Sequence, residues 1–207
     1  MKREEKNQQT RRRIMDSALA EFSRRGYGAS SINTICAAQD ISKGIVYHYF
    51  ETKDALFLAC VAECFQRLTE YIRENLLSRG DTEGCLEEYF ALRTRFFHAW
   101  PIYQRIFCEA VITPPSHLRA EIQTCRQDFD QLNLRILERL LAPLSLRPGI
   151  SKAEVIETFR QFQDFINIRY QTAEANGPEF AAREENCRKA LDILLYGVIE
   201  RENTSHV

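Results

Sequence analysis

The chain has 207 residues, 28% of them charged, and a net charge of −1 at neutral pH. This length is enough for one large domain or two smaller ones with a sizeable core. The longest uncharged apolar run, residues 55–62, is too short to span a membrane, and the charged N-terminus contains no signal-peptide core. The seven cysteines form an odd set without CxxC or clustered His/Cys spacing. We therefore expect reduced thiols in a cytoplasmic protein, with no metal site.

The charge is unevenly distributed along the chain. Residues 1–53 contain ten Lys/Arg and six Asp/Glu, a net charge of +4, whereas the remainder carries −5. A basic segment attached to an acidic body favours binding of a polyanion by the first quarter of the chain. Because an asymmetry of this size also arises by chance, it needs support from the pattern of elements.

Apolar spacing and capping signals predict helices through the first part of the chain. Ile14, Ala18 and Phe22 recur at helical spacing, and Gly26 supplies a C-terminal stop. The helices predicted here are 9–25, 31–39, 42–50 and 52–78. Their N-terminal caps are assigned to Ser30 or Ser31, to Ser42 and to Thr52.

Five further helices are predicted in the remainder, at 82–98, 101–112, 116–143, 151–175 and 178–202. Ser151 and Glu154 form a capping box, and the sequence Asn-Gly-Pro at 176–178 ends one helix and starts the next. We therefore predict an all-α fold of about nine helices.

The second and third predicted helices are joined by a turn of about three residues, the spacing of a helix-turn-helix. The second helix of such a motif enters the major groove of DNA by its N-terminal end. Val46 and Phe50 lie four residues apart and are assigned to the buried face of this helix, against Phe22 and Ile35. The rest of the helix is left to face a partner.

The side chains on that partner face suit DNA. Lys43 can donate to guanine or to a phosphate, and Ile45 can contact a thymine methyl. Gly44 has no side chain, so the backbone can approach the DNA closely. Phosphate contacts are predicted for Tyr47, His48 and Lys53, the last beside the N-terminus of the next helix.

Residues 10–56 resemble the N-terminal domain of the TetR family of transcriptional regulators. The resemblance rests on ordered segments at 12–14, 18–22, 26–27, 31–32, 35–36 and 42–50, the last reading Ser-Lys-Gly-Ile-Val-Tyr-His-Tyr-Phe. One departure is Asp40 at a turn position that is often Gly in the family, and Asp tolerates left-handed backbone. The DNA-contacting residues that motif and resemblance together imply are Ser30, Ser31, Ser42, Lys43, Gly44, Ile45, Tyr47, His48 and Lys53.

The resemblance also implies a division of labour between two domains. Residues 1–52 would form the helix-turn-helix domain, and residues 53–207 would bind a small-molecule effector and dimerise through the last two helices. Apolar stripes on those helices give the predicted dimer interface: Phe159, Phe162, Ile166, Leu191, Leu194 and Val198. The alternative is that both stripes only cover the core of one chain.

Aromatic residues are concentrated in the middle of the chain, where they could line a pocket for an apolar or aromatic effector. Ordinary core packing explains most of them. The candidate pocket residues are Phe97, Trp100, Tyr103, Phe107, Phe129, Phe162 and Gln163.

The function predicted from the sequence is a homodimeric repressor released from its DNA operator by a small effector, with no cofactor and no membrane partner. GxSxG, P-loop, HExxH and Rossmann motifs are absent from the sequence, so we do not expect an enzyme. Two alternatives stay open. One is a thiol-redox-sensing regulator on the same scaffold, and the other an enzyme pairing Cys108 or Cys125 with His98 or His117.

Overall fold

The computed structural model describes residues 3–76, 85–143 and 145–169, together with residues 182, 185, 186, 188–190 and 193. Every regular element in these residues is a helix, which confirms the predicted all-α fold. The predicted last helix at 178–202, the break at 79–81 and the stop at 176–178 lie outside the regular elements described. No helix in the described residues is long and apolar enough to cross a membrane.

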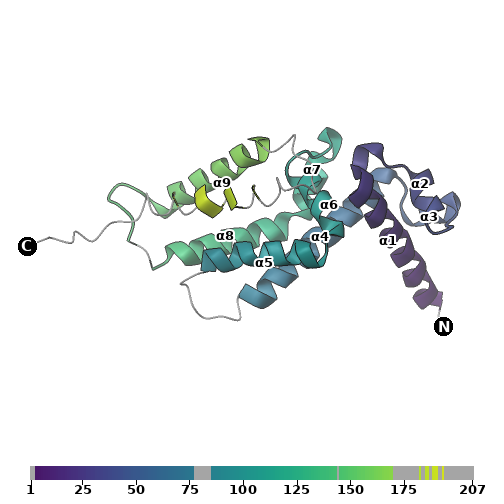
Figure 1. Ribbon diagram of the computed structural model, residues 1–207, viewed down its shortest axis with the longest axis horizontal. Helices are drawn as coiled ribbons and strands as arrows, with labels where there is room; N and C mark the ends of the chain where they lie inside the picture. Colours follow the sequence, from purple (N-terminus) through teal and green to yellow (C-terminus); the bar gives the residue numbers. More distant parts are fainter. Residues whose placement is uncertain are drawn as a thin grey trace, which may run out of the picture. The chain divides into compact units, whose positions relative to one another are not determined.

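Four helices lie within residues 3–76 (Figure 1). They are α1 (Arg3–Ala29), α2 (Ile32–Ala37), α3 (Lys43–Tyr49) and α4 (Lys53–Leu76). The predicted stop at Gly26 is a break inside α1, where φ is 75° and ψ is 172°, and one further turn follows it. The chain therefore leaves α1 toward α2 from a conformation that favours glycine.

The remaining described helices start after the gap at 77–84. They are α5 (Cys85–Ala99), α6 (Ile102–Val111), the short 3-10 helix η1 (Ser116–Leu118), α7 (Arg119–Cys125), α8 (Gln127–Leu141) and α9 (Lys152–Arg169). The capping box predicted at the start of α9 is present, because the Glu154 amide donates to Ser151 Oγ and the Ser151 amide donates to Glu154 Oε2.

The single helix predicted over 116–143 is instead three pieces, and the break between α7 and α8 lies at Arg126. This residue has φ −95° and ψ 0°, off the helical path, and its amide donates to the carbonyls of Ile122 and Thr124. Neither Gly nor Pro marks the break. The neighbouring Cys125 thiol donates to the Leu58 carbonyl of α4 at 3.8 Å. Packing on α4 thus competes with local helix propensity, which sequence patterns do not reveal.

By packing, the chain divides into two compact units. The first comprises residues 1–71 and 95–129, and the second residues 72–94 and 130–207. In the first unit α1 packs against both α2 and α6, so the three N-terminal helices share a core with part of the chain beyond residue 95. In the second, the Tyr89 hydroxyl donates to Asn133 and accepts from Arg93.

Candidate nucleic-acid interface

The turn between α2 and α3 depends on Asp40. Its φ of 51° places it in the left-handed region, as expected from the sequence, and the Ile41 amide donates back to the Cys36 carbonyl at 3.0 Å. Asp adopts this conformation more readily than most non-glycine residues. The turn that sets the angle between the two helices is therefore built without glycine.

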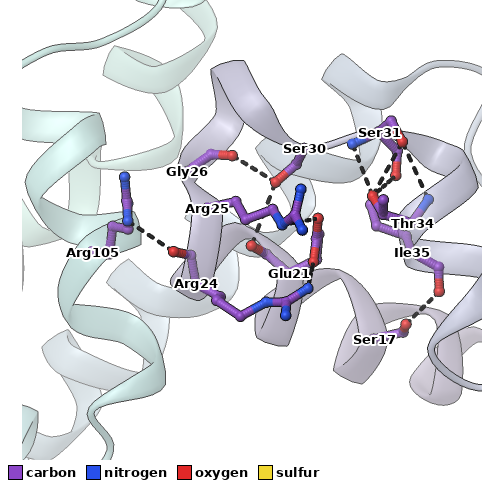
Figure 2. Close-up of polar contacts among 10 residues, drawn as sticks. All are labelled: Ser17, Glu21, Arg24, Arg25, Gly26, Ser30, Ser31, Thr34, Ile35 and Arg105. Atoms are coloured by element: carbon purple, nitrogen blue, oxygen red, sulfur yellow. Dashed lines mark hydrogen bonds and ion pairs between the residues drawn. The ribbon is translucent and has the colours of Figure 1, made fainter.

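Side-chain caps fix where the helices begin. Of the two candidates for the cap of α2, Ser31 fills the position: its hydroxyl accepts from the Thr34 amide, and Thr34 Oγ1 accepts from the Ser31 amide (Figure 2). Ser42 caps α3 by accepting from the Ile45 amide at 3.3 Å. The Ser17 hydroxyl of α1 donates to the Ile35 carbonyl at 2.6 Å, which ties α2 to α1.

The helix α3 has one buried and one exposed face. Val46 is completely buried and Phe50, just beyond the helix, is 5% exposed, as predicted. The opposite side is exposed and carries the predicted DNA-contacting residues Ser42, Lys43, Gly44, Ile45, Tyr47 and His48. Ile45 is 43% exposed and Tyr47 48% exposed, although both have large apolar surfaces. A face of this composition, with donors between exposed apolar groups, suits the edges and backbone of DNA.

Gly44 has no internal reason to be glycine. A Cβ atom added there meets no atom within 4 Å, and its φ is not positive. Ala would be the better helix former at this position. What a side chain at position 44 could obstruct is therefore a partner approaching α3 from outside.

Three other predicted contacts have roles inside the protein. Ser30 is 5% exposed, and its hydroxyl donates to the Gly26 carbonyl at 2.6 Å, which is an internal role. The Ser31 hydroxyl serves the cap of α2. The Lys53 ammonium donates to the carbonyls of Tyr27 at 2.9 Å and Ser30 at 3.1 Å, and lies 4.1 Å from the Tyr27 ring centroid. One of its three N–H groups remains for a phosphate.

Arg11 is a candidate that the sequence analysis did not single out. Its guanidinium lies 5.2 Å from the ring centroid of Phe50, at the end of α3, and among the described residues it has no hydrogen bond or ion pair. The next residue, Arg12, is ion-paired with Asp16 and Glu63, and Arg13 donates to the Gln39 carbonyl. The three consecutive arginines look equivalent in the sequence, and only the folded structure shows that their partners differ.

The predicted pocket residues of α5, α6 and α8 lie together in an aromatic cluster. Phe97, Phe107 and Phe129 are buried, with ring centroids 5.0 Å apart for Phe97 and Phe107 and 6.0 Å for Phe107 and Phe129. Tyr103 is also buried and its hydroxyl donates to Glu63, whereas Trp100 is 39% exposed. The side chains of Phe162 and Gln163 lie outside the described residues, as do those of the predicted dimer interface except Phe159, which is 9% exposed.

The cysteines have the environment of packed apolar groups. Cys36, Cys60, Cys64 and Cys108 are buried and Cys125 is half-buried. Burial raises the pKa of the Cys36, Cys60, Cys64 and Cys125 thiols, which keeps them protonated and weakens their nucleophilicity. This disfavours the redox alternative at these four sites.

The Cys/His alternative also lacks support in the described contacts. His117 Nε2 lies 3.2 Å from the Tyr27 hydroxyl and 3.3 Å from Asp54 Oδ2, and the Cys125 thiol is directed to the Leu58 carbonyl. His98 is exposed, whereas Cys108 is buried. The contacts described for His117 and Cys125 are thus with other groups, whereas a catalytic pair requires a hydrogen bond between the nucleophile and its base.

Comparison with known proteins agrees with this interface. Residues 14–60 match the family model described as bacterial regulatory proteins of the tetR family. The negative transcriptional regulator IcaR of the biofilm operon icaADBC, from Staphylococcus aureus (strain Newman), is 30% identical over 178 residues, covering 74% of this chain and 93% of IcaR. The chain belongs to the TetR family.

One further regulator and one solved structure are similar to this chain. The HTH-type transcriptional regulator UidR of Escherichia coli (strain K12) is 29% identical over 107 residues, 52% of this chain and 55% of UidR, so the match spans about half the length of that relative. The solved structure of FadR from Bacillus subtilis in complex with stearoyl-CoA superposes with a TM-score of 0.68 at 14% identity, covering 90% of this chain and 98% of FadR. At that identity the likeness shows the TetR-family fold alone.

Proposed function

We propose that this TetR-family chain is a sequence-specific transcriptional repressor that acts in the cytoplasm as a homodimer and leaves its operator when a small apolar or aromatic effector binds. The observation that carries the DNA-binding part is the exposed face of α3, where Lys43, Ile45 and Tyr47 face solvent beside a glycine that the fold does not require. In this proposal Lys43 and Ile45 read bases, and Tyr47 and His48 hold phosphates.

The test is selection of duplexes from a randomised pool by the full-length chain, followed by titration of the selected duplex. Lys43→Ala should cost on the order of 1–3 kcal/mol and relax sequence preference. Lys152→Ala, which removes an exposed lysine of α9, is the matched control and should leave binding intact. Failure of the wild-type chain to enrich any sequence would exclude the proposal, and an unaffected Lys43→Ala variant would exclude the reading residue.

We place the effector site at the aromatic cluster of Phe97, Phe107 and Phe129, with Tyr103 of the same helix α6 as a predicted addition. The B. subtilis FadR structure holds stearoyl-CoA, a ligand with a long apolar chain, which supports a search among apolar compounds. Because the rings contact one another, a ligand must separate them, and affinity should follow the apolar area it buries.

Release of the labelled duplex is the readout for the effector, with stearoyl-CoA as the first probe and a set of apolar and aromatic compounds after it. If the Phe107 ring only fills the core, Phe107→Ala lowers the thermal midpoint measured without ligand. If the ring also contacts the effector, the variant additionally binds the effector more weakly. A complete set that leaves the duplex bound would contradict release by such compounds.

Dimerisation is proposed for the apolar stripes of α9 and of the sequence beyond it. Two copies would place their α3 helices for half-sites one DNA turn apart, roughly 34–36 Å. Sedimentation of the full chain at micromolar concentration should give a dimer, and Leu194→Glu should give a monomer that also loses operator binding. A wild-type monomer at that concentration would exclude this arrangement.

A further inference from the structure

The break in α1 brings a distant carboxylate onto the backbone. An added Cβ at Gly26 would lie 2.0 Å from Glu109 Oε1, so the carboxylate packs directly on the glycine. A residue other than glycine is therefore disfavoured at position 26 for two reasons: the φ of 75°, and the clash of its Cβ with Glu109. Glu109 belongs to α6, 82 residues from its hydrogen-bond partner Tyr27.

Two residues of α6 satisfy the backbone groups that the break leaves without helical partners. Glu109 Oε2 accepts from the Tyr27 amide at 2.9 Å, and Arg105 Nη1 donates to the Arg24 carbonyl at 2.9 Å (Figure 2 shows the latter). The two side chains lie one turn apart, with 3.7 Å between Arg105 Nε and Glu109 Oε1. One helix therefore supplies both an acceptor and a donor to the end of α1.

The position of Glu109 is energetically demanding. Its side chain is 19% exposed, and burial raises its pKa although the Tyr27 amide, Arg105 and Lys53 act in the opposite direction. A carboxylate in such a place is tolerated when its hydrogen bonds are made. Movement of Glu109 away from Tyr27 would leave both groups poorly satisfied, so the contact resists displacement of α6 relative to α1.

The same helix faces the aromatic cluster with its other side. Tyr103 and Phe107 lie four residues apart, as do Arg105 and Glu109, and the two pairs are offset by two residues, which places them on opposite faces of α6. Phe107 contacts Phe97 and Phe129, whereas Glu109 contacts Tyr27. The thickness of a single helix separates the two sets of contacts.

We propose that Arg105 and Glu109 are positioning residues, which hold the break in α1 and thereby set the direction in which α2 and α3 present their exposed face. This inference rests on the proposed function. Beyond the break, Ser30 braces the connection through the Gly26 carbonyl, and Ser17 holds α2 through the Ile35 carbonyl.

The test compares spacing discrimination in full-length variants, with the duplex that the wild-type chain selects from a random pool. A second duplex carries one extra base pair between the half-sites. A correctly held pair of recognition helices should lose about tenfold or more in affinity on this insertion. For Glu109→Ala we expect weaker binding to the selected duplex. The inserted base pair should lower its affinity by only about threefold or less, because loosely held α2 and α3 helices can adapt to either spacing.

Three further measurements separate positioning from general stability. Glu109→Gln keeps an acceptor for the Tyr27 amide and should restore most of the discrimination, whereas Glu121→Ala, an exposed glutamate of α7, should not alter it. Amide exchange at Tyr27 should accelerate in Glu109→Ala while the amides of α3 stay protected. If Glu109→Ala does not fold, Arg105→Ala, which leaves the carboxylate in place, replaces it.

The outcomes are distinct. If both variants discriminate between the two spacings as the wild-type chain does, Arg105 and Glu109 are structural only and the inference is overturned. If the wild-type chain selects no duplex at all, the proposed function itself fails.

Discussion

Arg11, Arg12 and Arg13 share one chemistry, yet each has a different role in the structure. Arg12 is held between Asp16 and Glu63, and Arg13 is attached to the turn between α2 and α3 through the Gln39 carbonyl. Arg11 rests on the ring of Phe50 with its N–H groups available beside the exposed face of α3. Its proposed role is to hold a DNA phosphate, as a fork of donors in a fixed place.

For Arg11 we predict a change in the salt dependence of DNA binding. Arg11→Ala should reduce the slope of log affinity against log salt by about 0.9 per protomer, since one phosphate contact is lost. Its thermal midpoint should hardly move. Arg119→Ala, an exposed arginine of α7, serves as the control in the same titrations. An unchanged slope for Arg11→Ala would remove it from the interface.

Gly44 leads to a prediction in which stability and binding move in opposite directions. Gly44→Ala should raise the free energy of unfolding by up to about 0.5–1 kcal/mol, because Ala favours the helix and the added methyl meets open space. DNA affinity should fall, because the methyl group lies on the exposed face. Gly28→Ala is matched, since a Cβ there also meets no atom within 4 Å, and should leave affinity unaltered. Full DNA binding by Gly44→Ala would mean that α3 does not approach DNA at this residue.

At the scale of elements, the contact of α1 with α4 and α6 centres on Glu63. Its carboxylate accepts from Arg12 Nη1 at 2.7 Å and from the Tyr103 hydroxyl at 2.6 Å, and Arg67 lies 3.4 Å away. Burial acts to raise the pKa of Glu63, but the hydrogen bonds of Arg12 and Tyr103 outweigh it and the net pKa is lowered. The ionised form therefore stabilises the folded state, through contacts to two other helices.

This lowered pKa predicts loss of stability in acid. The contribution of Glu63 is present above its ordinary pKa of 4.5 and disappears as pH falls through the lower folded value. Glu63→Gln should lower the free energy of unfolding by about 1–3 kcal/mol at neutral pH. Below pH 4.5 the free energy of unfolding of this variant should depend less steeply on pH than that of the wild type. Urea unfolding between pH 7 and 3 measures both. If the free energies of unfolding of variant and wild type fall in parallel as the pH is lowered, groups other than Glu63 cause the loss of stability in acid.

Local features of the elements were predictable from the sequence, and distant ones were not. The caps at Ser42 and Ser151, the left-handed Asp40 and the burial of Val46 follow from residue types within a few positions of one another. The break at Arg126 depends on packing and has no local signal. The separate roles of Arg11 and Arg12, and the pairing of Glu109 with Tyr27, likewise require partners far along the chain.

At the scale of the whole molecule, the unit that contains the DNA-binding helices is larger than the segment that resembles the family's N-terminal domain. Phe22 of α1 contacts Phe57 of α4 with ring centroids 5.1 Å apart, and Tyr27 contacts α6. Both contacts lie in the compact unit made by residues 1–71 and 95–129. The predicted boundary at residue 52 stays a functional proposal, whereas the packing of the core extends past it.

A fragment of residues 1–55 is therefore expected not to fold on its own. It keeps the helix-turn-helix but removes Phe57 from Phe22, Glu63 from Arg12 and Glu109 from Tyr27, which exposes apolar area and orphans a partly buried amide. Circular dichroism should show reduced helix content and thermal melting without a sharp transition. A cooperative transition in this fragment would show that the three N-terminal helices are stable without their partners.

The contact of Glu109 with the break at Gly26 also bears on how such proteins can recombine. A DNA-binding segment exchanged at residue 52 would arrive in a new body without the acceptor for its Tyr27 amide or the donor for its Arg24 carbonyl. A chimera would retain the geometry of its donor only where the receiving α6 already carries an acid and a base one turn apart at the matching height. The DNA-binding segment and α6 would therefore have to be transferred together, and a gene fusion at a single junction separates them.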